Sequence, residues 1–184
     1  MLTGLGAEVV LVRRAAELDD VDGLVLPGGE SSVIDKLSRA FGLQAPVRAK
    51  IARGMPVFGT CAGLILLADR VEGLIRGQQT FGGLDITARR NAFGSQIDSF
   101  DTELVAPDLG AAPVAASFIR APVVASVGAS VRVLATLPSG VAVAVEQGPL
   151  LATAFHPEMT GETRFHERFL ASVATSRARQ ETRV

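Results

Sequence analysis

The sequence FGTCAGL, at residues 58–64, holds the only cysteine of the chain, Cys61. An apolar run at 55–58 leads into it, and a second apolar run at 64–68 leads out of it. Small residues on both sides of Cys61 suit a sharp turn from a strand into a helix, because a side chain in such a turn must clear crowded backbone. The turn would expose the sulfur and point helix N-terminal amides at it, which favours a thiolate nucleophile. By itself the stretch is equally compatible with a small buried apolar side chain, the role of most lone cysteines.

A second strand, turn and helix in succession precede Cys61 in the sequence. Residues 23–26 are wholly apolar, as expected for a short strand in a parallel sheet that is covered on both faces. The turn PGGESS follows at 27–32, and its two glycines let backbone amides approach a ligand. Ser31 and Ser32 are candidate N-caps for a helix expected over 32–41. That helix has apolar residues at helical spacing, namely Val33, Ile34, Leu37 and Phe41. A plain turn without a ligand remains the alternative.

The order of the expected elements favours an α/β fold. Residues 7–12 are expected to form a strand, 46–53 a helix, and the run after Cys61 a helix that ends near Val71. This order indicates a parallel sheet with helices on its faces. Ligands bind such sheets at the carboxyl ends of the strands, where the turns at 27–32 and at Cys61 both lie.

Beyond Gly82 the chain changes to short apolar runs separated by Gly and Pro, which predicts mostly antiparallel strands. The expected strands are 84–88, 100–105, 114–119, 131–135, 141–145 and 150–155. The last of them returns to the main sheet, and a terminal amphipathic helix follows over 162–173. The predicted fold class is therefore α/β, with three layers: a mostly parallel central sheet, flanking helices and an antiparallel strand segment. We expect residues 1–184 to form one domain, with a core at 1–175 and a frayed, charged tail at 176–184.

The composition argues against several classes of function. A hydrophobic content of 48%, a charged content of 20% and a formal net charge of -1 give no sign of a nucleic-acid surface. No apolar run approaches the roughly 20 residues that a membrane-spanning helix needs, and the N-terminus lacks the pattern of a signal peptide. One cysteine excludes an internal disulfide and a multi-cysteine metal site, which fits a reducing compartment. We therefore expect a cytoplasmic protein that binds neither membrane nor nucleic acid.

The sequence AFHPE, at residues 154–158, offers partners for the cysteine. It ends the last expected strand, so His156 and Glu158, two residues apart, would face the same way. His156 would take the proton of the Cys61 thiol, and Glu158 would hold the imidazole in the required tautomer. The alternative for His156 is a structural, hydrogen-bonded histidine. The other histidine, His166, lies within the final helix and is interpreted as a surface or helix-packing residue.

These motifs together resemble a known family. GTCAG at 59–63, HPE at 156–158 and PGGES at 27–31 resemble the class I (triad) glutamine amidotransferases, and more closely the glutaminase subunit of pyridoxal 5'-phosphate synthase. Further stretches favour that subunit over other class I glutaminases: RRNAFG at 89–94, QIDSF at 96–100, FIRAP at 118–122 and HPEMT at 156–160. The resemblance runs from about Gly6 to the terminal helix.

The resemblance implies hydrolysis of L-glutamine to L-glutamate and ammonia. Cys61 would attack the side-chain amide carbonyl, His156 would relay protons, and Glu158 would orient His156. Backbone amides at Gly29 and Ala62 would hold the tetrahedral oxyanion. The resemblance implies no metal and no bound cofactor for this reaction.

It also implies a set of residues that contact the substrate, matching Gly28, Gly29, Glu30, Arg90, Ile119 and Arg120. Physically, Arg90 or Arg120 would pair with the α-carboxylate of glutamine, and Glu30 with its ammonium. The sequence does not separate the roles of the two arginines, and the alternative for each is a solvated surface charge.

The family has a required partner. Its ammonia passes to a separate synthase subunit, an oligomeric TIM barrel, which joins it to a pentose phosphate and a triose phosphate. The resemblance thus implies two binding partners for this chain, L-glutamine and that synthase subunit.

The sequence departs from the family at two places. The family begins with a further strand and a helix, and Met1 falls within the counterpart of that helix, so the family's N-terminal strand is expected to be absent and a sheet edge exposed. Ser95 stands where the family usually has an arginine. Two other functions therefore stay open: a truncated, catalytically silent regulatory or binding subunit, and the glutaminase of another amidotransferase.

Overall fold

The structure is a computed structural model and describes residues 1–92 and 99–182. Its strands are β1 (Leu24–Leu26), β2 (Val57–Thr60), β3 (Ala68–Glu72), β4 (Leu84–Arg89), β5 (Ser99–Leu104), β6 (Val114–Ile119), β7 (Val123–Val127), β8 (Arg132–Thr136), β9 (Ala142–Gln147) and β10 (Leu150–Thr153). Its α-helices are α1 (Ser31–Ala40), α2 (Gln44–Ala52), α3 (Ala62–Leu67) and α4 (Arg164–Glu181). Short 3-10 helices are η1 (Leu2–Leu5), η2 (Ala15–Asp19), η3 (Pro107–Leu109) and η4 (Pro157–Met159).

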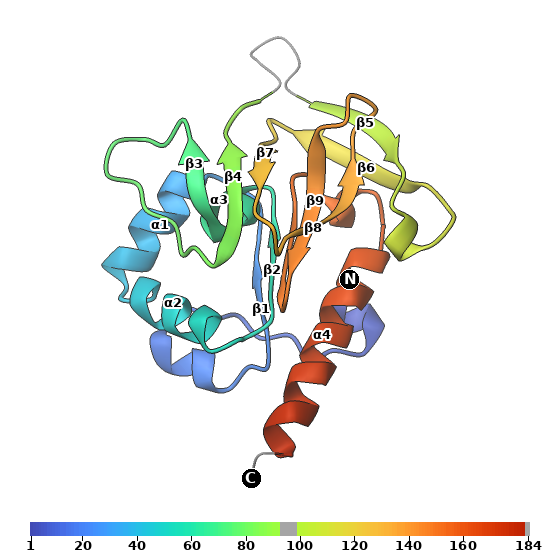
Figure 1. The fold of residues 1–184 in the computed structure, drawn as a ribbon. Helices are drawn as coiled ribbons and strands as arrows, with labels where there is room; N and C mark the ends of the chain where they lie inside the picture. Colours follow the sequence, from blue (N-terminus) through green and yellow to red (C-terminus); the bar gives the residue numbers. More distant parts are fainter. Residues whose placement is uncertain (93–98, 183–184) are drawn as a thin grey trace.

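Three parallel strands place the candidate site. Strand β2 lies between β1 and β10 and runs parallel to both. All residues of β2 and β10 are buried, because α1 and α2 lie on one side of these strands in Figure 1 and α4 on the other. On the α4 side, the rings of His166 and Phe169 pack against Phe58 of β2. The carboxyl ends of the three strands meet at one edge, so the turn after β1, the cysteine after β2 and the histidine after β10 come together.

The rest of the sheet is largely antiparallel. Among the described residues, the main sheet has the order β1-β2-β10-β9-β7-β4-β3, with β8 paired to β9 outside this path, and β5 and β6 form a separate antiparallel ribbon (Figure 1). Strand β9 runs antiparallel to β10, β7 and β8, whereas β3 and β4 are parallel. The predicted α/β class is confirmed, as is the return of the last strand to the parallel part of the sheet.

In the middle of the chain, one predicted element has a wrong end and one strand was not predicted. The helix after Cys61 ends at Leu67 instead of near Val71, because Ala68 takes an extended conformation and begins β3, which pairs with β4. Strand β7 was not expected at all, although it joins β4 to β9. In both cases pairing with a distant strand decides the conformation of a short apolar run that local pattern leaves ambiguous.

The strand expected at 7–12 does not form. This segment pairs with no strand in the described part of the chain, and Val9, Val10 and Leu11 are 52%, 53% and 71% exposed. Strand β1 pairs, among the described residues, with β2 alone and forms the edge of the sheet. A strand gains its stability from pairing and packing, so an apolar run without a neighbouring strand stays irregular.

The helices differ from expectation in their ends and faces. The N-cap of α1 is Glu30, not Ser31 or Ser32. Its apolar residues Val33 and Leu37 are exposed, while its polar residues at 31, 35 and 38 are buried. The loop that follows β3 binds two of these three, Ser31 and Asp35. Helix α4 continues to Glu181, through positions where a frayed tail was expected. No helix in the described part of the chain has both the length and the hydropathy to cross a membrane.

Candidate active site

Cys61 lies at a strained turn between β2 and α3. Its backbone has φ 50 and ψ -101, a region that residues with a side chain rarely occupy. Two glycines make the turn possible: a Cβ on Gly59 would lie 2.6 Å from the carbonyl of Gly63, and a Cβ on Gly63 would lie 2.2 Å from the carbonyl oxygen of Leu26. The Cys61 amide donates to the carbonyl of Thr153 at 2.8 Å, which ties the turn to β10. Backbone packing therefore fixes where the sulfur lies.

His156 and Glu158 follow β10 and lie beside this turn. Glu158 Oε1 is 2.7 Å from His156 Nδ1. A carboxylate only accepts, so Nδ1 carries the proton of this bond. The ring also lies beside the side chain of Cys61, and a hydrogen bond between the two raises the pKa of His156. The backbone amide of His156 is also held, because it donates to the carbonyl of Ser117 in β6 at 3.0 Å. The three predicted residues thus form one line of hydrogen bonds.

The charges along this line favour an imidazolium. Hydrogen bonds with Cys61 and then Glu158 raise the pKa of His156 to about 10, although burial acts in the opposite direction. Burial would raise the pKa of Glu158, but the hydrogen bond from His156, a backbone hydrogen bond and the charges of the two histidines together hold the pKa below its usual value. At neutral pH the ring is therefore a cation between two groups that can each carry a negative charge, which suits a cysteine nucleophile.

The turn after β1 packs against the histidine. A Cβ on Gly28 would lie 2.2 Å from Cε1 of His156, so only glycine fits there. Gly29 has φ 134, a conformation that also favours glycine. Ala62 is buried and directly follows the cysteine. The two residues expected to supply oxyanion amides, Gly29 and Ala62, thus lie on the two turns that meet at the end of the parallel strands.

A charged cluster forms the next part of the site. Arg90 Nη2 donates to Glu30 Oε1 at 2.8 Å, and the Arg90 side chain is only 10% exposed. The same oxygen of Glu30 accepts from the hydroxyl and amide of Ser32. Burial would raise the pKa of Glu30, but the Ser32 hydrogen bonds and the charges of Arg90 and Arg120 hold it below its usual value. Two arginine charges therefore act on one carboxylate at the N-terminus of α1.

The remaining predicted residues lie at the end of β6. Ile119 ends this strand and is partly exposed, and Arg120 follows with φ 44. Strand β6 also carries Ser117, which binds the His156 backbone, so it connects the charged cluster to the histidine. Ser95 and the beginning of the motif at 96–100 lie outside the described residues.

Further residues of the site carry no motif in the sequence. Thr153 and Ser117 act through their carbonyls, which no side-chain motif indicates. Gln78, in the loop after β3, accepts a hydrogen bond from Arg90 Nη1 at 3.1 Å. Ser32 was noticed as a candidate cap, and its spacing two residues after Glu30 is the one local signal for its contact with that carboxylate.

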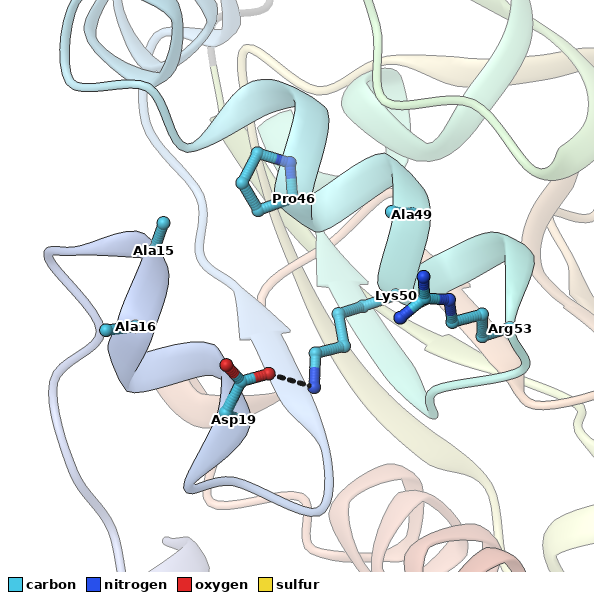
Figure 2. Close-up of a pocket in the computed structure, with 7 residues that line it drawn as sticks. All are labelled: Ala15, Ala16, Asp19, Pro46, Ala49, Lys50 and Arg53. Atoms are coloured by element: carbon cyan, nitrogen blue, oxygen red, sulfur yellow. Dashed lines mark ion pairs between the residues drawn. The ribbon is translucent and has the colours of Figure 1, made fainter.

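A shallow pocket of about 280 Å³ lies elsewhere, between η2 and α2 (Figure 2). It is lined by Ala15, Ala16, Asp19, Pro46, Ala49, Lys50 and Arg53. Lys50 pairs with Asp19 at 2.7 Å, and none of the predicted site residues lines the pocket. The described residues also include no cluster of three His, Cys, Asp or Glu side chains placed to bind a metal.

An α/β sheet that brings an elbow cysteine, a histidine and a glutamate into one line of hydrogen bonds has the arrangement of a cysteine-nucleophile enzyme. Comparison with known proteins identifies the family. The chain belongs to the SNO glutamine amidotransferase family, whose model matches residues 2–175.

Individual relatives agree with this assignment. The pyridoxal 5'-phosphate synthase subunit PdxT of Leifsonia xyli subsp. xyli (strain CTCB07) is 60% identical over 173 residues, covering 94% of this chain and 87% of the relative. The subunit of the same name from Clavibacter sepedonicus is 58% identical, with 94% and 83% covered. A crystal structure of a glutamine amidotransferase has a TM-score of 0.87 and 41% identity, and covers 94% of this chain and 90% of that one. The predicted likeness to the glutaminase of pyridoxal 5'-phosphate synthase is confirmed.

Proposed function

We propose that this chain hydrolyses L-glutamine to L-glutamate and ammonia through Cys61, and that it supplies the ammonia to the synthase subunit of a pyridoxal 5'-phosphate synthase. One observation carries the proposal: the line of hydrogen bonds from Cys61 through His156 to Glu158, at the end of the parallel strands. Membership of a glutamine amidotransferase family and the names of the relatives support the substrate.

The chemistry follows from the charges in this line. The Cys61 thiolate attacks the amide carbonyl of glutamine, and the imidazolium of His156 gives its proton to the nitrogen as the C–N bond breaks, releasing ammonia. Water then attacks the thioester and gives a proton to His156. The C–S bond breaks, glutamate leaves, and the Cys61 thiolate and the His156 imidazolium are restored. Glu158 keeps the imidazole in place throughout. Amides at Gly29 and Ala62 stabilise the oxyanion of both tetrahedral intermediates.

The charged cluster would recognise the other end of glutamine. An α-amino acid carries a carboxylate and an ammonium on the same carbon, and the cluster offers arginines beside a carboxylate. Arg90 and Arg120 would bind the α-carboxylate, Glu30 the ammonium, and Gly28 and Ile119 would border the substrate.

The partner is a synthase subunit, which the word subunit in the relatives' names supports. By resemblance, this partner is an oligomeric TIM barrel that uses the ammonia directly. We further propose that residues 1–184 act as one glutaminase domain in the cytoplasm, where the thiol of Cys61 stays reduced.

The test is glutamate release from glutamine by the full chain, with and without the synthase subunit. We expect release that the partner raises, and none from Cys61→Ala. Arg177→Ala, an exposed change on α4 away from these residues, is the control and should retain full activity. If the complete wild-type complex releases no glutamate, the chain is a silent subunit and the proposal is wrong. If the chain instead binds the synthase of another amidotransferase in a pull-down, it is the glutaminase of a different complex.

A further inference from the structure

Gln78 connects the charged cluster to the N-terminus of α1. It lies in the β3–β4 loop, which we define as residues 73–83. Its side-chain Oε1 accepts from Arg90 Nη1 at 3.1 Å, and its Nε2 donates to Ser31 Oγ at 3.0 Å. Ser31 is buried, and Arg90 is nearly so. One amide group therefore joins two side chains that come from distant parts of the sequence.

The orientation of this amide follows from its partners. An arginine can only donate, so the Gln78 oxygen must face Arg90, and the amide nitrogen is left for the Ser31 hydroxyl. The guanidinium of Arg90 is then held at both terminal nitrogens: Nη2 donates to Glu30, and Nη1 donates to Gln78 and, at a longer 3.4 Å, to the carbonyl of Gly73. Two contacts on different nitrogens fix both the position and the plane of the group, whereas a single contact would let it rotate.

Within the β3–β4 loop, the Gln78 side chain makes one long contact, from the amide of Ile75 to Oε1 at 3.5 Å, and other contacts hold the loop in position. The amide of Gln79 donates to Asp35 Oδ2 at 3.1 Å, and Asp35 is buried and paired with Arg39. Arg48 of α2 donates to the carbonyl of Thr80 at 3.2 Å. These contacts anchor the loop to α1 and α2 beside Gln78. Removing the Gln78 side chain should therefore release Arg90 and leave the loop in place.

We propose that Gln78 is a positioning residue for glutamine binding, which holds the guanidinium of Arg90 towards the α-carboxylate of the substrate. This inference rests on the proposed function. A neutral amide suits the task, because Arg90 already faces one carboxylate in Glu30. A second carboxylate on the same guanidinium would compete with the carboxylate of glutamine. Gln78 thus steers Arg90 without neutralising its charge.

The experiment compares Gln78→Ala, Gln78→Glu and the control Gln79→Ala in the complex with the synthase subunit. Loosening one hydrogen bond to a charged group should raise KM for glutamine about tenfold in Gln78→Ala, with kcat within about twofold. Gln78→Glu should raise KM at least as much, although it preserves the size and the acceptor. Gln79→Ala should leave both constants within about twofold of wild type, because the Gln79 side chain does not contact Arg90 in the described structure.

A second readout separates positioning from general damage. Iodoacetamide should alkylate Cys61, the only thiol of the chain, and this reagent does not need the amino-acid head group. Its rate should be the same in wild type and Gln78→Ala, and a higher glutamine concentration should be needed to protect Gln78→Ala from alkylation. An unchanged KM in Gln78→Ala, or an equal loss of kcat and alkylation rate, would overturn the proposal.

The protection measurement also separates the role of Gln78 from the proposed hydrolysis of glutamine. If wild type releases no glutamate but glutamine protects it better than it protects Gln78→Ala, the role of Gln78 holds and the hydrolysis does not. If glutamine does not protect wild type at all, the role of Gln78 is overturned as well.

Discussion

The two parts of the candidate site are held in different ways. Around Cys61, the backbone holds the site in place. Glycines pack against carbonyls, amides donate hydrogen bonds across strands, and the cysteine itself has a positive φ. Around Arg90, side chains hold the site, because the guanidinium donates hydrogen bonds to Glu30 and Gln78. Backbone packing allows few substitutions and fixes a reacting atom closely, whereas side-chain contacts can loosen by degrees. The first part should therefore fail abruptly when changed, and the second gradually.

The most direct way to break the backbone-held part is Gly63→Ala. Its Cβ would lie 2.2 Å from the Leu26 carbonyl oxygen, and backbone on both sides has no room to yield. We expect a loss of at least about 3 kcal/mol in the free energy of unfolding, measured by urea titration. Gly4→Ala is the matched control: no atom lies within 4 Å of its Cβ position, and the change should stay within about 0.5 kcal/mol. A loss below about 1 kcal/mol in Gly63→Ala would show that the turn yields after all.

The charged part should respond more gradually, and two neighbouring arginines test this. Arg90→Ala removes a nearly buried guanidinium, and we expect KM for glutamine to rise about 100-fold with a smaller change in kcat. Arg89 is the next residue, but its pair with Glu72 is half exposed on both sides. Arg89→Ala should change KM less than about twofold, since such pairs contribute little. Similar KM values for the two variants would mean that burial does not mark the binding arginine.

His156 belongs to both parts, because its position is backbone-held and its charge depends on side chains. Its pKa is raised from 6.5 to about 10. Below pH 6.5 the ring is protonated in the folded and the unfolded chain, so its interactions contribute fully to stability. As the pH rises, the unfolded ring loses its proton first, and the contribution disappears as the pH passes through about 10.

The measurement is the difference in unfolding free energy between wild type and His156→Gln, taken from about pH 6 to about pH 10. The difference should shrink steadily over this range. Titration of Glu158 does not affect this difference. Because the pKa of Glu158 is lowered, its carboxylate loses its contribution to stability only below about pH 4.5. A difference that stays constant with pH would contradict the charged state of the ring.

The same contrast explains what the sequence could predict. The elbow at 59–63 needs small residues next to a cysteine, which is a local requirement and therefore visible as a motif. Gln78 lies 47 positions from Ser31, and a glutamine in a loop carries no local mark of such a contact. The strand expected at 7–12 failed for the opposite reason: the local pattern was present, but a strand also needs a neighbour. Local chemistry was thus predictable where the backbone imposes it, and not where tertiary contacts do.

Arg120 combines both kinds of support, because this residue of the charged cluster has a backbone-held conformation. Its φ of 44 is unfavourable for any residue with a Cβ. Arg120→Gly and Arg120→Ala both remove the charge that acts on Glu30, but only glycine relieves the backbone. Glycine should therefore exceed alanine in unfolding free energy by about 1 kcal/mol, while both raise KM equally. Equal stabilities would mean that the turn after β6 relaxes freely, and a lower KM for glycine would mean that the strain itself affects glutamine binding. The expected result separates the two contributions: the arginine is present for its charge, and the chain tolerates the strained backbone to place it beside Glu30.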